Sequence, residues 1–365
     1  MIGFTGGGTG GHIFPCIAVI EELRRRGHEE FVWIGQRGGR EEGWALRIGV
    51  PFWGIQTGKL RRYVSLKNVA DTLRVLIGFF QSLLLLLRLK PDVLFSKGGF
   101  VSVGPVIAAR LLGISVVTHE SDIVPGLATR IISRFASAIC ISFEKTRDFV
   151  SGRRVVCTGN PVRKIIKEGD REAGMSFLQC EEGLPVILVV GGSSGAARLN
   201  DVAWRMKKRF TLPFSLVHQC GEGNLRKDIE MGPRYRQFSF FDEEMGDVIA
   251  ASDLIVSRAG AGALYEFGCL SKPAILVPLP KTASRGEQIE NARSFEEHGA
   301  AVVIQNEDLD EELLFSTIER LISDHDSLKR MGEAAHSLCT PDAENAISDI
   351  IESLRGVKQG PRERK

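Results

Sequence analysis

Residues 2–15, Ile-Gly-Phe-Thr-Gly-Gly-Gly-Thr-Gly-Gly-His-Ile-Phe-Pro, place a glycine-rich turn between an apolar strand and the start of an apolar helical stripe. Such a turn predicts an anion site, because free N–H groups and the positive end of the helix dipole face the ligand. Residues 6–11 also fit the dinucleotide pattern G-x-G-x-x-G. That pattern needs an acidic residue after the second strand, whereas residues 31–34 are followed by Gly-Gln. We therefore expect phosphate binding at this turn and no nicotinamide or other cofactor.

Short runs of valine, isoleucine and leucine recur along the chain, each followed by a turn and a helical pattern. Continuous apolar strands are typical of parallel sheets, and their alternation with helices indicates βαβ units. The series restarts at Pro185 after a polar stretch. We predict an α/β protein of two Rossmann-like domains, each with a doubly wound parallel sheet, separated by a cleft. The predicted strands are residues 31–34, 93–96, 115–118, 138–141, 186–190, 214–218, 254–257 and 274–278.

The length of 365 residues suits two α/β domains of ordinary size. An amphipathic helical pattern over residues 343–354 follows the second series of strands. The predicted segments are an N-terminal domain (1–158), a linker (159–164), a C-terminal domain (165–340), a helical segment that packs back towards the N-terminal domain (341–356) and a frayed tail (357–365).

Composition indicates a soluble globular enzyme, with 43% hydrophobic and 25% charged residues. The net charge of +2 is uninformative, and we expect no nucleic-acid partner. The seven cysteines are scattered without a C-x-x-C pair, which argues against a disulfide framework and a zinc site and fits a reducing cytoplasm. The first strand follows Met1 directly, so we expect no signal peptide.

The segment Asp308-Leu309-Asp310 has the D-x-D pattern, which can bind a metal ion through its two carboxylates. It stands just before an apolar helical run, where acidic residues cap the helix and complement its dipole. We expect capping here and no metal site.

Eight motifs resemble, in order, those of the MurG family, the undecaprenyl-diphospho-muramoylpentapeptide N-acetylglucosaminyltransferases of glycosyltransferase family 28 and the GT-B fold. The resemblance implies inverting transfer of N-acetylglucosamine from UDP-GlcNAc to the 4-hydroxyl of a lipid-linked muramoyl pentapeptide. It also implies a peripheral protein at the cytoplasmic face of the inner membrane, with cell-wall synthesis proteins as possible partners. The motifs are residues 6–12, 96–105, 119–127, 158–163, 191–200, 218–221, 257–266 and 288–292.

The resemblance assigns binding roles along the chain. It implies that Ser193 and Arg163 contact the donor diphosphate, that Glu266 binds the ribose hydroxyls, and that Asp242 contacts uracil through its backbone. Gln288 and Asn291, three apart on a predicted helix, would bond the sugar. The other implied donor contacts are Thr9, Gly10, Gly11, Asp122, Ala261, Gly262 and Ala263, and the implied contacts of the acceptor diphosphate are Gly8, Gly98, Gly99 and Ser102.

The reaction that the resemblance implies needs a general base, and His12 is our first candidate because an imidazole serves near neutral pH. In the competing interpretation His12 only shapes the phosphate loop, and Glu120 is then the base. Arg163 and the helix dipole behind the third glycine loop would stabilise the leaving UDP without a metal.

Three positions depart from the family pattern. Asp122 replaces the usual Asn, Ser194 replaces Gln and Ala263 replaces Thr. These changes leave individual donor contacts open. The alternative functions are a related GT-B transferase with another lipid acceptor, a UDP-sugar 2-epimerase and a non-catalytic UDP-sugar sensor, and turnover would separate them.

The longest apolar run, Val75 to Leu87, has 13 residues, too few for a bilayer span of about 20. Its length favours a buried core helix. The lipid acceptor and the nearby basic residues favour instead a half-exposed helix that docks on an anionic membrane surface. These basic residues are Lys59, Arg61, Arg62, Lys67, Arg74 and Arg88.

Overall fold

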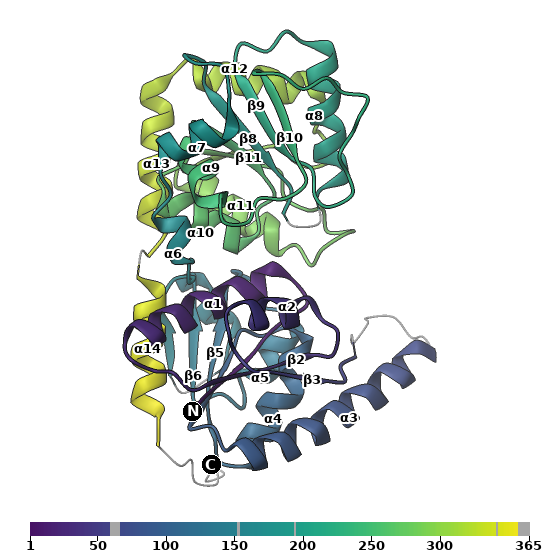
Figure 1. The fold of residues 1–365 in the computed structure, drawn as a ribbon, viewed down its shortest axis with the longest axis vertical. Coiled ribbons are helices and arrows are strands. Elements are labelled where there is room, and N and C mark those ends of the chain that lie inside the picture. The colour runs from purple at the N-terminus through teal and green to yellow at the C-terminus, as the bar shows by residue number, and fades with distance from the viewer. Residues whose placement is uncertain (59–65, 152–153, 193–194, 341, 357–365) are drawn as a thin grey trace. The chain divides into compact units, whose positions relative to one another are not determined.

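The computed structural model describes residues 1–58, 66–151, 154–192, 195–340 and 342–356. Unit 1 comprises Met1–Arg163 and the segment that starts at Asp342, and unit 2 comprises Lys164–Pro341. Figure 1 shows that each unit contains one twisted sheet covered by helices. The described strands form one seven-stranded and one six-stranded sheet, and every pairing is parallel. The predicted α/β class is confirmed.

The sheet of unit 1 has the strand order β3-β2-β1-β4-β5-β6-β7. The chain therefore builds outward from β1 in one direction and from β4 in the other, and a doubly wound sheet binds ligands where its order reverses. The strands are β1 (Ile2–Thr5), β2 (Phe31–Gln36), β3 (Phe52–Ile55), β4 (Val93–Ser96), β5 (Ser115–Glu120), β6 (Ala138–Ile141) and β7 (Val155–Cys157).

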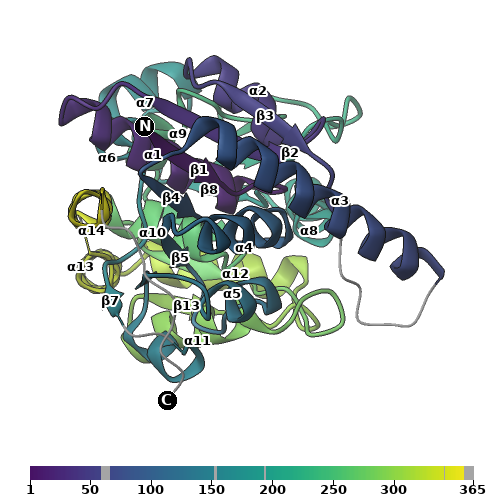
Figure 2. The ribbon, with the colours of Figure 1, turned by 90° about the horizontal axis from the view of Figure 1, so that it is seen from below.

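Helices of unit 1 pack on both faces of this sheet. Ile17 and Ile20 of α1 (Gly10–Arg25) share a buried cluster with Ile347 of α14 (Ala343–Leu354). A second cluster includes Leu86 and Val106, and Figure 2 shows their two helices running side by side. The remaining elements are α2 (Arg40–Arg47), α3 (Leu66–Leu89), η1 (Phe100–Ser102), α4 (Val103–Leu111), α5 (Leu127–Ile132) and η2 (Glu144–Phe149).

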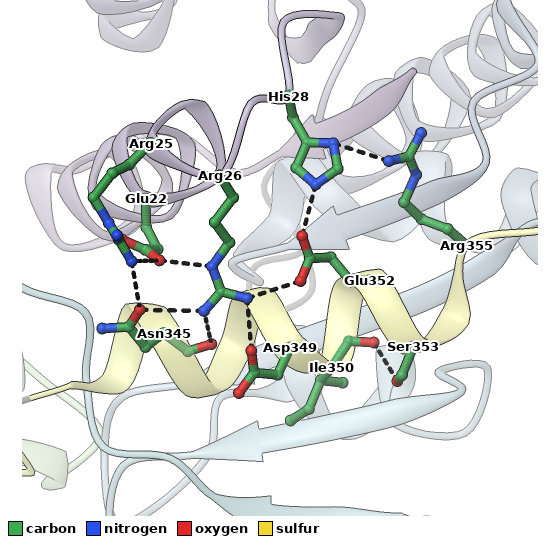
Figure 3. A network of polar contacts seen from close by, with 10 residues as sticks. All are labelled: Glu22, Arg25, Arg26, His28, Asn345, Asp349, Ile350, Glu352, Ser353 and Arg355. Atoms are coloured by element: carbon green, nitrogen blue, oxygen red, sulfur yellow. Dashed lines mark hydrogen bonds and ion pairs between the residues drawn. The ribbon is translucent and has the colours of Figure 1, made fainter.

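An ion-pair network fastens α14 to the end of α1 (Figure 3). The guanidinium of Arg26 bonds Glu22 at 2.6 Å, Asp349 at 2.6 Å and Glu352 at 2.8 Å. Glu352 also accepts from His28, at 2.7 Å. Arg26 is only 18% exposed, so these bonds are less screened than ordinary surface pairs. The last described helix thus belongs physically to unit 1, although residues 164–340 precede it.

The sheet of unit 2 has the order β10-β9-β8-β11-β12-β13, and its order reverses between β8 and β11. The strands are β8 (Val186–Val190), β9 (Ser215–Gln219), β10 (Tyr235–Phe238), β11 (Leu254–Ser257), β12 (Ala274–Leu276) and β13 (Ala301–Val303). The helices are α6 (Lys164–Lys167), α7 (Arg171–Leu178), α8 (Ala197–Arg209), α9 (Met245–Ala251), α10 (Ala261–Cys269), α11 (Glu287–Glu297), α12 (Glu311–Ile322) and α13 (His325–Leu338).

The D-x-D segment caps a helix. The carboxylate of Asp310 accepts a hydrogen bond of 2.8 Å from the backbone N–H of Leu313, and Asp310 is the N-cap residue of α12. The expected capping role of Asp310 is confirmed.

The apolar run over 75–87 lies on α3, and one face of this helix is exposed. We call this face the α3 stripe; its exposed fractions reach 58% at Phe80 and 68% at Leu84. The opposite face packs on α4 through Phe79, Leu83 and Leu86. A fully buried core helix is therefore the wrong interpretation. No helix among the described residues is long and apolar enough to cross a membrane. The α3 stripe consists of Leu73, Leu76, Ile77, Phe80, Leu84 and Leu87.

Candidate active site

In both units, the glycine turns of the predicted site lie at the carboxyl ends of the strands where the sheet order reverses. The first glycine loop follows β1 and the second follows its neighbour β4. In unit 2 the third glycine loop follows β8, and the residues from Arg258 to Ala263 follow its neighbour β11. Parallel strands deliver these turns to one edge of each sheet, which is where doubly wound folds bind ligands.

The first loop turns sharply at Gly8, whose φ of +86° is a conformation that favours glycine. The helix α1 then begins at Gly10, three residues earlier than the pattern of apolar residues predicts. Gly10 and Gly11 are its first two residues, and no acidic residue occupies the first turn. The positive end of the α1 dipole is therefore uncompensated by acidic side chains of its first turn, as an anion site requires.

Buried Glu41, on α2, holds the first loop in place. One carboxylate oxygen accepts from the N–H of Gly8 at 3.1 Å and the other accepts from the N–H of Gln36 at 2.8 Å. A Cβ added to Gly7 would lie 2.2 Å from the carboxyl group, so this close approach requires glycine there. Sequence analysis missed Glu41 because it belongs to no motif.

Replacing Glu41 by alanine should leave two backbone donors without their partner. An unsatisfied buried donor costs about 1–3 kcal/mol, so we expect the free energy of unfolding to fall by about 2–6 kcal/mol. The KM of the acceptor should rise more than the KM of the donor. Urea unfolding and steady-state kinetics measure both effects. Glu42→Ala is the matched control, since Glu42 makes one exposed bond to Gly38, and equal losses in the two variants would contradict the assignment.

The second loop contacts the first. Gly98 and Gly99 have φ values of +82° and +78°, and a Cβ on Gly99 would lie 3.3 Å from His12 Nε2. A Cβ on Gly8 would likewise lie 3.3 Å from the ring of Phe100. The imidazole of His12 is therefore packed where the two loops meet. Ser102 is fully buried and its hydroxyl donates to the carbonyl of Gly98 at 2.7 Å, so it shapes this loop from within.

A buried cation underlies the two loops. Lys97 is 1% exposed, and its Nζ donates to Ser121 Oγ at 2.5 Å. Burial lowers the pKa of Lys97, while the carboxylates of Glu120 and Asp122 oppose that shift. Burial, helped by the charge of Lys97, also lowers the pKa of His119 well below its usual value. His119 Nε2 donates to the carbonyl of Gly159 at 2.9 Å, so His119 is a neutral structural residue.

Glu120 is the last residue of β5 and Asp122 follows that strand, beside the second loop. Glu120 is 6% exposed, and its carboxylate accepts from the N–H of Asp122 at 3.1 Å. Asp122 is half-buried. Arg163 belongs to unit 1, is 8% exposed and stacks its guanidinium 4.1 Å above the ring of Phe14. Its buried Nε has no hydrogen-bond partner among the described residues.

The third glycine loop of unit 2 is braced by a buried polar chain. Gly195 has a φ of +74°, and a Cβ there would lie 2.1 Å from the carbonyl oxygen of Cys220. That oxygen also accepts from Asn200 Nδ2 at 2.7 Å. Asn200 Oδ1 accepts from His218 Nε2 at 3.1 Å, and burial lowers the pKa of His218 to about 3, so this histidine is neutral. Ser193 and Ser194 lie outside the described residues.

The start of α10 leaves room for a ligand. A Cβ added to Gly260 or Gly262 would meet no atom within 4 Å. Gly262, Ala263 and half-buried Glu266 share one face of this helix by their spacing, whereas Ala261 is buried. One face of α10 therefore presents two small residues near the turn and the carboxylate of Glu266 one helical turn further along.

The two residues expected to bond the sugar make hydrogen bonds within unit 2. Asn291 is fully buried and its Nδ2 donates to the carbonyl of Ala259 at 3.1 Å. Gln288 Oε1 accepts from the N–H of Leu279 at 3.1 Å. Asp242 is half-buried and directly follows Phe241, whose N–H is bonded by Gln219. Lys97 and Gln219 are further residues without an assigned role in the sequence motifs.

Among the described residues, no three His, Cys, Asp or Glu side chains gather into a group that could hold a metal ion.

Two Rossmann-like sheets, each with a glycine turn at its reversal point, define the GT-B class of glycosyltransferase folds. The family model of the glycosyltransferase family 28 N-terminal domain matches residues 2–141, and that of the C-terminal domain matches residues 186–354. The chain belongs to glycosyltransferase family 28 and, within it, to the MurG family.

Individual relatives are similar along nearly their whole length. A Treponema pallidum (strain Nichols) protein named UDP-N-acetylglucosamine–N-acetylmuramyl-(pentapeptide) pyrophosphoryl-undecaprenol N-acetylglucosamine transferase is 44% identical, over 98% of this chain and 96% of its own. A Lachnospira eligens protein of the same name is 43% identical, over 88% and 90%. The crystal structure of Acinetobacter baumannii MurG superposes with a TM-score of 0.73 at 28% identity, over 96% of this chain and 99% of that one.

Proposed function

We propose that this chain transfers N-acetylglucosamine from UDP-GlcNAc to the 4-hydroxyl of the muramoyl sugar in undecaprenyl-diphospho-MurNAc-pentapeptide. The observation that carries the proposal is 44% identity, over 98% of the chain, to a relative named for this transfer. The glycine loops of both sheets supply the two anion sites that a nucleotide diphosphate and a lipid diphosphate need.

In this proposal the donor binds to unit 2. The third glycine loop and the open turn before α10 receive the diphosphate, Glu266 accepts hydrogen bonds from the ribose hydroxyls, and the backbone at Asp242 contacts uracil. Gln288 and Asn291 complete the sugar site, which requires their present bonds to Leu279 and Ala259 to be shared or exchanged. Arg163, Ser193 and Asp122 are further donor contacts in the proposal, with Thr9, Gly10, Gly11, Ala261, Gly262 and Ala263.

The acceptor diphosphate binds where the first two loops of unit 1 meet, at Gly8, Gly98 and Gly99. Lys97 adds a buried positive charge beneath this point, and a charge in a desolvated site acts over a longer range than one in water. Ser102 contributes by fixing the carbonyl of Gly98. The uncompensated N-terminus of α1 faces the same anion.

His12 is the general base of the proposed reaction. The acceptor 4-hydroxyl oxygen forms a bond to the anomeric carbon of the donor while the bond from that carbon to the β-phosphate oxygen breaks. The electron pair leaves with UDP, the hydroxyl proton passes to the imidazole, and the α-linkage becomes a β-linkage. Helix N-termini and Arg163 stabilise the charge on UDP without a metal ion.

Purified protein supplied with UDP-GlcNAc and the lipid-diphospho-muramoyl pentapeptide should release UDP and form the disaccharide lipid in equal amounts. Binding of UDP-GlcNAc without release of UDP would contradict the enzyme and favour a UDP-sugar sensor. Turnover with diacylglycerol in place of the diphospholipid would favour the alternative acceptor class.

We further propose that the α3 stripe rests on the anionic cytoplasmic face of the inner membrane as a peripheral contact. Six large apolar side chains are exposed on one helix face, and Arg74 and Arg88 are exposed on the same helix. Apolar side chains enter the acyl boundary while basic ones meet lipid phosphates. Lys59, Arg61 and Arg62 lie outside the described residues, as does the side chain of Lys67. Cell-wall synthesis proteins remain further candidate partners.

Replacing Phe80 and Leu84 together by glutamate should abolish sedimentation with vesicles rich in anionic lipid at low salt. Burying each side chain contributes about 1.5–3 kcal/mol, so losing both lowers the partition coefficient at least tenfold. Leu225→Glu is the control, because Leu225 is an exposed leucine of unit 2, 49% accessible. Sedimentation of the double variant at the level of this control would refute membrane contact by α3.

A further inference from the structure

Gln219, the last residue of β9, bridges two separate parts of the proposed donor site. Its Nε2 donates to the carbonyl oxygen of Gly192 in the third glycine loop, at 3.3 Å. Its Oε1 accepts from the backbone N–H of Phe241, at 3.1 Å. These contacts span 27 and 22 residues of sequence.

The chemistry of the two partners fixes the orientation of this amide. A carbonyl oxygen only accepts and a backbone N–H only donates, so reversing the amide would set donor against donor and acceptor against acceptor. Gln219 is 1% exposed, and water cannot readily replace either bond. Losing this side chain therefore leaves the buried N–H of Phe241 unsatisfied and removes one of the hydrogen bonds to the carbonyl of Gly192.

The two bridged segments have different tasks in the proposed function. The carbonyl of Gly192 also accepts from the N–H of Gly195 at 3.0 Å, and this hydrogen bond connects the two sides of the diphosphate loop. Phe241 is 1% exposed and directly precedes Asp242, where the backbone meets uracil in the proposal. The Gln219 amide sets the position of one segment relative to the other.

We propose that Gln219 is a positioning residue that couples recognition of the diphosphate to recognition of the base, so that a ligand with both parts binds cooperatively. The inference rests on the proposed function. A ligand that occupies two subsites binds more tightly when their spacing is fixed. A loose connection between the subsites removes this additional affinity. A ligand that has only the base or only the diphosphate loses little affinity.

The test measures the Kd of UDP, of uridine and of inorganic pyrophosphate for the unaltered protein and for Gln219→Met, which keeps the length and removes both bonds. A loss of about 2 kcal/mol of coupling raises the Kd of UDP roughly 30-fold. The Kd values of uridine and pyrophosphate should each rise less than about threefold, because neither ligand spans both subsites.

Gln237→Met is the matched control. Gln237 lies on the adjacent strand β10 and also makes two backbone bonds, but both go to Arg226, at 3.1 and 2.5 Å. The Tm should fall similarly in the two variants. Only Gln219→Met should weaken the binding of UDP more than the binding of uridine or pyrophosphate. Equal effects on UDP in both variants, or equal weakening of UDP and uridine by Gln219→Met, would overturn the inference.

Gln219→Glu gives a second, independent measurement. An ionised carboxylate still accepts from Phe241 but repels the carbonyl of Gly192, and protonation restores a donor towards that carbonyl. Burial raises a carboxyl pKa, so the side chain should become protonated as the pH falls from about 8 to about 6. The KM of UDP-GlcNAc should therefore fall over this range. The unaltered protein should not show this change in KM, and the kcat of the variant should follow that of the unaltered protein at each pH. If the KM of this variant does not depend on pH, Gln219 is not the positioning residue that we propose.

The two levels of proposal fail separately. If the unaltered protein does not bind UDP, the proposed function itself is wrong. If it binds UDP and Gln219→Met behaves like Gln237→Met, only the coupling role is wrong.

Discussion

Replacing His12 by alanine is expected to lower kcat by about 10²–10⁴-fold, the usual contribution of a general base. The Kd of UDP-GlcNAc should change less than about threefold, since His12 is not among the proposed donor contacts and a base acts only on the reacting proton. Single-turnover rates of sugar transfer and equilibrium donor binding measure the two quantities. His12 packs against Gly99, so a folding control by circular dichroism accompanies both.

The competing assignments give different results. If Glu120 is the base, Glu120→Gln should lose as much rate as His12→Ala does under our proposal, and His12→Asn should retain most of the rate. If His12 only shapes the phosphate loop, His12→Ala should raise the KM of the acceptor with little change in kcat. Restoration of the His12→Ala rate by added imidazole would favour the base, since a free imidazole replaces its proton transfer and not its packing.

Gly195→Ala is expected to remove donor binding, with a rise of at least about 100-fold in the Kd of UDP. The new Cβ would lie 2.1 Å from the carbonyl oxygen of Cys220, a backbone atom that is itself bonded to Asn200. The residue also has a φ of +74°, which an alanine reaches only with strain of about 1–2 kcal/mol. The third loop must therefore move away from β9, and the proposed diphosphate site moves with it. Isothermal titration with UDP measures the effect.

Gly192→Ala is the control for this prediction, because Gly192 belongs to the same loop and shares the positive φ of Gly195. Gly192 has a φ of +82°, but a Cβ there would meet nothing within 4 Å. It therefore carries the backbone strain without the collision. A Kd of UDP that rises equally in both variants would show that backbone strain alone, and not the contact with β9, governs the loop.

Central strands were predictable from sequence, and the edge strands were not. Residues 93–96, 138–141, 186–190 and 254–257 form strands at the predicted bounds, because strands buried on both faces need continuous apolar side chains. The four strands that apolar runs do not reveal, β3, β7, β10 and β13, all lie at the edges of their sheets. These strands have only three or four residues, most of them half-buried, so they stand out less from the loops around them than the central strands do. Four predicted strands differ slightly in their bounds: β2 and β5 each end two residues later, at Gln36 and Glu120, β9 covers 215–219 and β12 ends at Leu276.

The course of α3 shows a limit of a different kind. Length and hydropathy of residues 75–87 suit a buried helix equally well, because periodicity reports one apolar face and here nearly the whole surface is apolar. Only packing shows which side chains contact α4 and which form the exposed α3 stripe.

Sequence by itself determined the two sheets, the positions of the glycine turns and the family, because these depend on local patterns: apolar runs, left-handed glycines and helix starts. Tertiary structure alone decided which side chains hold those turns. Glu41 reaches Gly8 across 33 residues, and Gln219 reaches Gly192 across 27. A hydrogen bond between distant residues leaves no periodic trace in the sequence, since any buried polar residue at a strand end or on a helix has the same local pattern. The first loop is thus recognised from its own seven residues, 6–12, but its shape is fixed by a carboxylate from another helix.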